Sequence, residues 1–214
     1  SYDNYVLKNI IYERNGQEEN YYKSAVIENL RFYRDLAKFE DWQAIDEHTH
    51  ENYRLTKDID LAGKTNVKTN VSFGRLEGIN GEMHALKNIN VTLPNAYSGL
   101  ISAVTTNMSN VSFENITLNS TYQSIDDSYG VSFGVVVINF GDIDNVNFKN
   151  INIDAPNISY VGPIARNSGT DIKNVTIENN TISGYHYVGG FIGHANNVDI
   201  HTVNASGCTV TGRY

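Results

Sequence analysis

Two histidines and a glutamate stand together at His48-Thr-His50-Glu51, and these residue types could hold a metal ion. Zinc peptidases place two His one helical turn apart, with a Glu beside the first His to deprotonate the metal-bound water, in the pattern His-Glu-x-x-His. His48 and His50 are two positions apart, so they point away from each other on a helix and share one face of a strand. We therefore predict a solvated linker here, and neither metal ligands nor catalytic residues in this chain.

Asp58 and Asp60 alternate along an expected strand and could form the carboxylate pair of a glycosidase. A second interpretation, which we favour, is that both carboxylates accept hydrogen bonds from turns. The other histidines, His84, His186, His194 and His201, are dispersed along the chain. No Ser or Asp stands at a recognisable motif spacing from any of them, so the sequence predicts no catalytic group there. His194 follows Gly193 as Arg166 follows Ala165, so an outward turn residue is expected. At Cys208 we expect a buried or turn thiol rather than a nucleophile.

A repeat of about 28 residues must position these side chains. The segment Gly162-Pro-Ile-Ala165 reappears as Gly190-Phe-Ile-Gly193, and Asp171-Ile172 reappears as Asp199-Ile200. Earlier copies are recognisable back to Leu86. The predicted structural positions form a glycine column and an asparagine column: Gly99, Gly134, Gly162 and Gly190, and Asn88, Asn115, Asn150 and Asn179. The asparagine column is expected to form a ladder of side chains at a turn.

Apolar residues alternate within each copy, as in Val111-Ser-Phe113 and Ile116-Thr-Leu118, so each copy contains short strands with one inward face. Asn and Gly stand at the joints, where the left-handed backbone is easily reached. A leucine-rich repeat is excluded because it needs a fixed Leu pattern and a helical half. The sequence therefore predicts an all-β fold, a right-handed parallel β-helix whose equivalent residues stack about 4.8 Å apart.

The ends of the chain differ from its middle. Residues 1–24 contain a hairpin signal at Asn15-Gly16, between Tyr5–Tyr12 and Tyr21–Val26, and form either a β-hairpin or the end of an upstream domain. Residues 25–52 are expected to form an N-terminal cap, with a helix around 38–48 on the apolar spacing Leu36, Phe39, Trp42 and Ile45. Residues 53–214 form the β-helix, which we expect to be truncated at its C-terminal end in a piece of a longer protein.

The composition is that of a folded, acidic chain. Of its 214 residues, 40% are hydrophobic and 19% are charged, and the net charge is −8. Nucleic acid and anionic membrane surfaces are poor partners because both need a basic face. No apolar run is long enough for membrane insertion, and a single Cys cannot form an internal disulfide. These observations exclude several partner classes without identifying one.

One insertion interrupts the repeat. The copies that begin at Gly99 and Gly134 are 35 residues apart, and about seven additional residues fall within 120–129. Loops inserted into solenoids emerge on one face and frequently bind partners. Tyr122, Asp126, Asp127 and Tyr129 are therefore candidate contacts for a protein partner, whereas the alternative is a tolerated surface bulge.

Three segments resemble a known family. Asn52-Tyr53-Arg-Leu55-Thr-Lys-Asp58-Ile-Asp60-Leu61, followed by Phe73-Gly-Arg-Leu76-Glu-Gly78, resembles the first rung of GLUG β-helix modules, and Tyr187-Val-Gly-Gly190-Phe-Ile-Gly193 resembles the repeat that names them. Together with Trp42, they are most similar to the N-terminal peptidase region of the Gram-positive immunoglobulin A1 protease and zinc metalloprotease family. The resemblance covers roughly residues 25–214.

The resemblance implies a large zinc endopeptidase, secreted or attached to the cell wall, that cleaves host glycoproteins such as immunoglobulin A1. It implies zinc in the catalytic domain of the parent protein, whereas no cofactor is expected in this chain. The expected partners are a host protein substrate and other domains of the same polypeptide.

A carbohydrate-binding or carbohydrate-active β-helix, or a bacterial surface adhesin, remains the alternative. A uronate-cleaving enzyme would need a basic cluster or bound calcium, yet the only Lys and Arg residues from residue 101 onward are Lys149, Arg166, Lys173 and Arg213.

Overall fold

A computed structural model describes residues 11–14, 17–20, 33–46, 48–125 and 130–213 of the chain. The chain divides into two units, Ser1–Phe32 and Tyr33–Tyr214. In the first unit, β1 (Ile11–Arg14) pairs antiparallel with β2 (Gln17–Asn20), on either side of Asn15-Gly16. The remainder of the expected hairpin strands lies outside the described residues.

The second unit is built almost entirely of strands. Its strands are β3 (Arg34–Leu36), β4 (Asn52–Leu55), β5 (Ile59–Asp60), β6 (Val71–Gly78), β7 (His84–Leu93), β8 (Tyr97–Ser120), β9 (Ser132–Asn139), β10 (Asp142–Asp154), β11 (Tyr160–Val161), β12 (Ile164–Asn167), β13 (Asp171–Glu178), β14 (Thr181–Gly184), β15 (Tyr187–Val188), β16 (Ile192–Ala195), β17 (Asp199–Ser206) and β18 (Thr209–Gly212). A short 3-10 helix, Ile79–Gly81, follows β6, and the one described α-helix is α1 (Phe39–Gln43).

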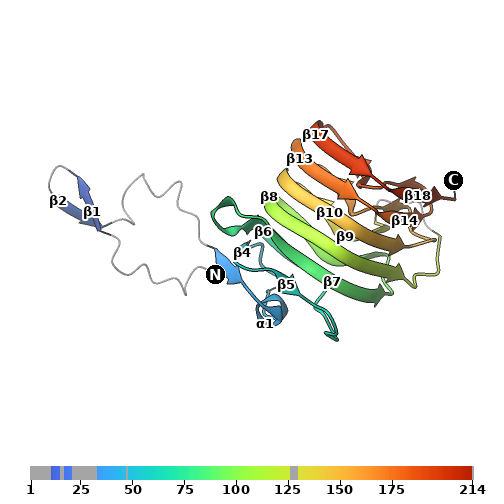
Figure 1. Ribbon diagram of the computed structural model, residues 1–214, viewed down its shortest axis with the longest axis horizontal. Helices are drawn as coiled ribbons and strands as arrows, with labels where there is room; N and C mark the ends of the chain where they lie inside the picture. The colour runs from blue at the N-terminus through green and yellow to red at the C-terminus, as the bar shows by residue number, and fades with distance from the viewer. Residues whose placement is uncertain (1–10, 15–16, 21–32, 47, 126–129, 214) are drawn as a thin grey trace. The chain divides into compact units, whose positions relative to one another are not determined.

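All of these strands belong to one sheet of parallel pairs, which confirms the expected all-β class. Strands β7, β8, β10, β13 and β17 follow one another across the sheet in the order in which they occur in the chain. They lie side by side from green to red in Figure 1. We call residues 97–120, 132–154, 160–184 and 187–212 repeats 1 to 4, because each contains the same succession of strand segments. Phe113 of repeat 1 is thus paired with Phe148 of repeat 2, which is paired with Ile177 of repeat 3.

Asparagines at the joints hold the repeats in register. Asn88, Asn115, Asn150 and Asn179 all have φ between 54° and 62°, in the left-handed region. The Nδ2 of Asn115 donates to Oδ1 of Asn88 at 3.0 Å, and the Nδ2 of Asn150 donates to Oδ1 of Asn115 at 2.9 Å. A second ladder joins Asn145 to Asn110 at 2.9 Å. In these pairs the side-chain amide of one asparagine donates to the next while the backbone makes the turn.

The glycine column marks places where two backbones approach closely. A Cβ on Gly99 would lie 2.2 Å from the carbonyl oxygen of Gly134, and a Cβ on Gly134 would lie 2.2 Å from that of Gly162. In repeat 4 the register shifts by one residue, because β11 pairs with β15 as Val161 with Val188, so Gly189 rather than Gly190 comes opposite Gly162. Gly190 is the additional residue, which a constant spacing of 28 did not reveal.

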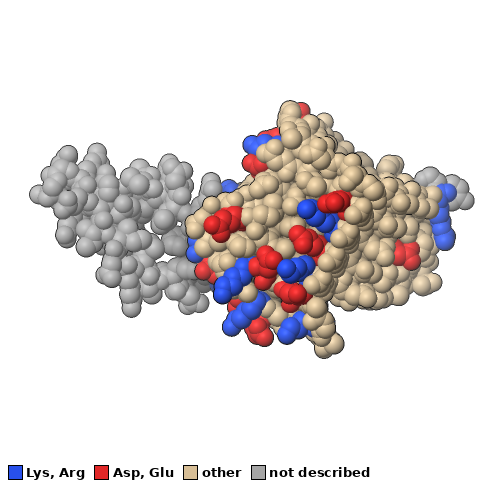
Figure 2. All heavy atoms as spheres, viewed as in Figure 1, with Lys and Arg blue, Asp and Glu red and all other residues tan. Residues whose placement is uncertain are grey.

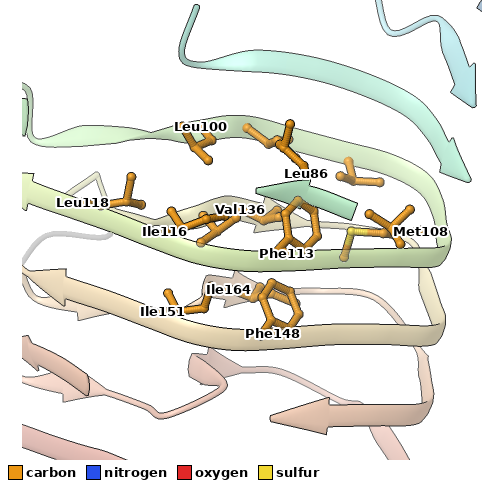
Figure 3. Close-up of a cluster of buried hydrophobic side chains, with 14 of the residues drawn as sticks. Leu86, Leu100, Met108, Phe113, Ile116, Leu118, Val136, Phe148, Ile151 and Ile164 are labelled. Atoms are coloured by element: carbon orange, nitrogen blue, oxygen red, sulfur yellow. The ribbon is translucent and has the colours of Figure 1, made fainter. Parts of the chain in front are cut away.

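The core runs continuously through the stacked repeats. Phe113 and Phe148 are fully buried, with ring centroids 5.1 Å apart and planes 14° apart. Figure 3 shows Val136 and Ile164, from β9 and β12, lying among the side chains of β8 and β10. Inward residues of successive repeats thus bury one another along the stack.

Helix α1 ends at Gln43 and is therefore shorter than the helix expected over 38–48, and Leu36 of the expected apolar spacing belongs to β3. Its buried Trp42 packs against Phe73 with ring centroids 6.1 Å apart, and the indole Nε1 donates to the carbonyl oxygen of Lys68 at 2.9 Å. The apolar spacing therefore identified the buried side chains better than it identified the helix. Within the described residues, no helix has the length and apolar character needed to cross a membrane.

Candidate functional site

The inserted segment is described only in its first part. Tyr122 is half-buried and packs against the core, while its carbonyl oxygen accepts a 3.0 Å hydrogen bond from Asn157, which lies between repeats 2 and 3. Ile125 is 55% exposed. Asp126, Asp127 and Tyr129 lie outside the described residues. The part that the structure describes is therefore held by the turn that follows repeat 2, and Tyr122 packs partly against the core.

Asp58 and Asp60 accept hydrogen bonds from β7 and from a turn. One Asp58 oxygen accepts from the backbone N–H of Ala85 at 3.0 Å and the other from Lys87 Nζ at 2.8 Å. The ammonium of Lys87 is the main reason that the pKa of Asp58 lies below its usual range. Asp60 Oδ1 accepts from Asn88 and from the N–H of Ala62, and the Asn88 amide chiefly lowers the pKa of Asp60. Asp60 thus continues the asparagine ladder beyond Asn88 to β5.

The histidine pair His48 and His50 lies in an exposed segment, and the neighbouring Glu51 accepts a 3.0 Å hydrogen bond from Arg34. Within the described part of the chain, no three His, Cys, Asp or Glu side chains gather in a way that could hold a metal ion. His84 stands 3.7 Å from Asp58, and His201 is exposed on β17. Cys208 is exposed, and its thiol faces the carbonyl oxygen of Ser206 at 3.4 Å.

Repeats 3 and 4 bring four other side chains together, and we call Tyr160, Arg166, Tyr187 and His194 the Tyr–Arg–His cluster. The Tyr160 and Tyr187 rings are stacked, with centroids 4.8 Å apart and planes 7° apart. The His194 ring stands nearly perpendicular to both, at 5.6 Å and 5.8 Å. The Arg166 guanidinium carbon lies 6.0 Å from the Tyr160 centroid, at the outer limit of a cation–π contact.

Strand register positions this cluster. Tyr160 pairs with Tyr187 across β11 and β15, while Arg166 pairs with His194 across β12 and β16. Gly162 lies between the two strand segments of repeat 3, and a Cβ there would be 2.9 Å from both Gly193 N and Ile164 O. Glycine therefore permits the close packing that brings the end of one strand segment towards the next.

The cluster combines exposed and buried groups. Tyr187 is 48% exposed and Tyr160 is 3% exposed, so the Tyr160 ring is buried in the protein while the Tyr187 ring is partly exposed to solvent. The same column continues through Ser132 to Tyr97. Burial raises the pKa of the Tyr97 hydroxyl, and the nearby positive charge of Arg166 partly opposes this effect. Arg166 therefore acts electrostatically on tyrosines from more than one repeat.

Charges elsewhere are mixed in sign. On the face shown in Figure 2, Lys and Arg side chains are interspersed with Asp and Glu, and much of the remaining described surface is uncharged. Lys149 lies 3.7 Å from Glu178, and Lys173 lies 3.7 Å from Asp144. This face offers no large basic field of the kind that nucleic acid binding uses.

The spacing of 28 residues aligns Arg166 with His194 but does not align Tyr160 with Tyr187. A local signal for the stacked tyrosines exists, since Tyr160-Val-Gly162 recurs as Tyr187-Val-Gly189 after 27 residues instead of 28.

Comparison with protein families, with curated proteins and with solved structures finds no match for this chain.

Proposed function

We propose that residues 33–214 form a right-handed parallel β-helix whose N-terminal end is capped around α1. Further, we propose that this is the β-helix module of a secreted or cell-wall-attached zinc metalloendopeptidase of the Gram-positive immunoglobulin A1 protease family. The supporting observation is the placement of the GLUG-like segment Tyr187-Val-Gly-Gly-Phe-Ile-Gly193. It falls on β15 and β16, which pair with β11 and β12 of the preceding repeat, so the motif coincides with a structural unit.

The packing of Trp42 supports the proposed cap. Strand edges and apolar side chains at the end of such a stack must be covered, and Trp42 is buried against Phe73 at the first strands of the unit.

The proposed role is scaffolding and recognition of a host glycoprotein substrate, immunoglobulin A1 in the first instance. Zinc and the catalytic residues belong to another domain of the parent protein in this proposal. Because the 214 residues contain no His-Glu-x-x-His sequence, we expect the isolated chain to have no peptidase activity.

The test is a surface-binding titration of the full chain against immunoglobulin A1, with circular dichroism to verify a β-rich fold. We expect saturable binding with a dissociation constant of about 1 μM. Immunoglobulin A1 lacking its hinge is the control and should bind at least about tenfold more weakly. Equal binding of the two immunoglobulins, or none by the folded chain, would contradict recognition of this substrate.

A further inference from the structure

We infer that Asp58 and Asp60 form an acid-sensitive clasp, which holds residues 56–70 against β7 and opens before the repeats unfold. We call residues 56–70 the strap, because they join β4 to β6 and contain the short strand β5. Among the described strands, β5 pairs only with β7. Figure 1 shows β5 and α1 at the end of the sheet that is opposite β17. The clasp belongs to the fold itself and is independent of the proposed substrate.

The second half of the strap is bonded to α1. The indole Nε1 of Trp42 donates to the carbonyl oxygen of Lys68. Gln43, the last residue of α1, bonds to the strap twice: its Oε1 accepts from the backbone N–H of Lys68 at 2.6 Å, and its Nε2 donates to the carbonyl oxygen of Asn66 at 2.8 Å. Trp42 is 1% exposed, so opening of the strap removes hydrogen bonds from a buried side chain.

The first half of the strap is bonded to β7 through the clasp. Asp58 accepts from the backbone N–H of Ala85 and from the ammonium of Lys87, and Asp60 accepts from the side-chain amide of Asn88. A hydrogen bond to an ionised carboxylate is roughly twice as strong as one between neutral groups. Protonation of the two carboxylates therefore weakens the attachment of the strap without changing its sequence.

Two basic side chains of β7 face Asp58. The hydrogen bond from Lys87 chiefly lowers the pKa of Asp58, and the charge of His84 acts in the same direction, whereas burial opposes them. The His84 ring stands 3.7 Å from Asp58 and 3.9 Å from Glu82, which precedes β7. The surroundings of Asp58 therefore favour its ionised form.

The surroundings of Asp60 act in the same sense. The amide of Asn88 chiefly lowers the pKa of Asp60, and the charge of Lys87 assists while that of Asp58 opposes. Lys87 in turn pairs with Glu114 of β8 across the sheet. Because both pKa values are lowered in the folded chain, the stabilisation is present above about pH 4 and is lost as the pH falls through the lowered values.

Apolar packing holds the strap once the clasp is protonated. Ile59 and Leu61 are each 1% exposed and stand next to the two aspartates in the sequence. The long strands of repeats 1 to 3 have paired neighbours on both sides, whereas β5 has β7 alone. Segments with fewer contacts open at a lower free energy than the core, so the strap should open first.

The single tryptophan of the chain makes this opening measurable. Acrylamide quenching of Trp42 fluorescence and circular dichroism are recorded on the full chain between about pH 7 and about pH 2. We expect the quenching constant to rise about threefold at a higher pH than that at which the strand signal is lost. Simultaneous change of both signals, or quenching that does not change while the sheet is intact, would overturn the inference.

A lysine variant tests the clasp through the position of the transition. Lys87→Met leaves both carboxylates in place but removes the ammonium, so Trp42 should become accessible at a pH at least about 0.5 unit higher than in the parent chain. The matched control is Lys149→Met, because Lys149 stands 3.7 Å from Glu178 in the repeats. Its quenching curve should match that of the parent chain. An unchanged midpoint in Lys87→Met would contradict the clasp.

Carboxamide variants remove the titrating groups themselves. The double variant Asp58→Asn, Asp60→Asn should raise the quenching constant at neutral pH about twofold and flatten its dependence on pH. Asp144→Asn is the control, because Asp144 likewise accepts from Asn174 and stands near Lys173 but lies in repeat 2. If the double variant does not fold, Asp60→Asn alone is measured in the same way. Equal quenching curves in the clasp variant and in Asp144→Asn, with both folded, would overturn the assignment.

Discussion

Repeats 3 and 4 share a sequence pattern and pair strand with strand, yet their inward residues differ greatly in exposure. Ile172 and Ile182 of repeat 3 are at most 1% exposed, whereas their partners Ile200 and Val210 in repeat 4 are 48% and 45% exposed. The residue types are similar, so the difference arises from the neighbours. An inward residue of repeat 3 is covered by repeats on both sides, and burial in this fold is therefore a property of the stack.

The largest expected difference between the two repeats is the cost of removing an inward isoleucine. Ile172→Ala should lower the free energy of unfolding by about 2–5 kcal/mol, because it leaves a cavity between repeats 2 and 4. Ile200→Ala should cost less than about 1.5 kcal/mol, since roughly half of that side chain is already in water. Urea denaturation followed by circular dichroism measures both values. Equal losses would show that repeat 4 is covered in solution in a way that its exposed fractions do not indicate.

Glycine substitutions extend the comparison of inner and last repeats to the backbone, with Gly134 in repeat 2 and Gly190 in repeat 4. Gly134→Ala places a Cβ 2.2 Å from the carbonyl oxygen of Gly162, and we expect a loss of about 1–3 kcal/mol in unfolding free energy. Gly190→Ala is the matched control, because its nearest neighbour would be Val210 Cγ2 at 3.4 Å, and it should change stability by no more than about 0.5 kcal/mol. The same denaturation experiment applies, and a neutral Gly134→Ala would mean that the two backbones can separate without cost.

Local patterns in the sequence predicted the strands and the joints. Alternation of apolar residues such as Val146 and Phe148 marks the inward face because side chains in a strand alternate with period two. The asparagine column was predictable because Asn tolerates the left-handed backbone, and its members Asn88, Asn115 and Asn150 do bond to one another.

The stacked tyrosines could not be found with the constant spacing used. A one-residue shift between β15 and β16 brings Tyr187 opposite Tyr160 while Ile192 remains 28 residues from its partner Ile164. Such a shift depends on how two backbones pack around Gly162 and Gly189, which alternation along one strand does not encode. The length of α1 also escaped prediction, because apolar spacing marked the buried Trp42 and Ile45 but does not mark the residue at which a helix ends. Leu36 fitted the same spacing but lies in β3, which pairs with β4.

The smallest expected effect is also the one in which the two repeats should differ in sign. Asn174 of repeat 3 and Thr202 of repeat 4 occupy equivalent positions with φ of 54° in both. Asn174 is suited to this conformation, and its Nδ2 donates to Asp144 at 2.8 Å. Thr202 is β-branched, so the left-handed backbone is strained there.

Replacing each residue with glycine separates these effects. Thr202→Gly should raise the free energy of unfolding by about 1 kcal/mol, because glycine adopts the left-handed backbone without the Cβ clash. Asn174→Gly keeps the backbone conformation but loses the hydrogen bond to Asp144, so stability should fall by about 0.5–1.5 kcal/mol. Urea denaturation with an unchanged m-value measures both changes. Were both glycine variants less stable than the parent chain, the prediction would be wrong, because the flexibility that glycine adds to the unfolded chain would outweigh any relief of strain at Thr202.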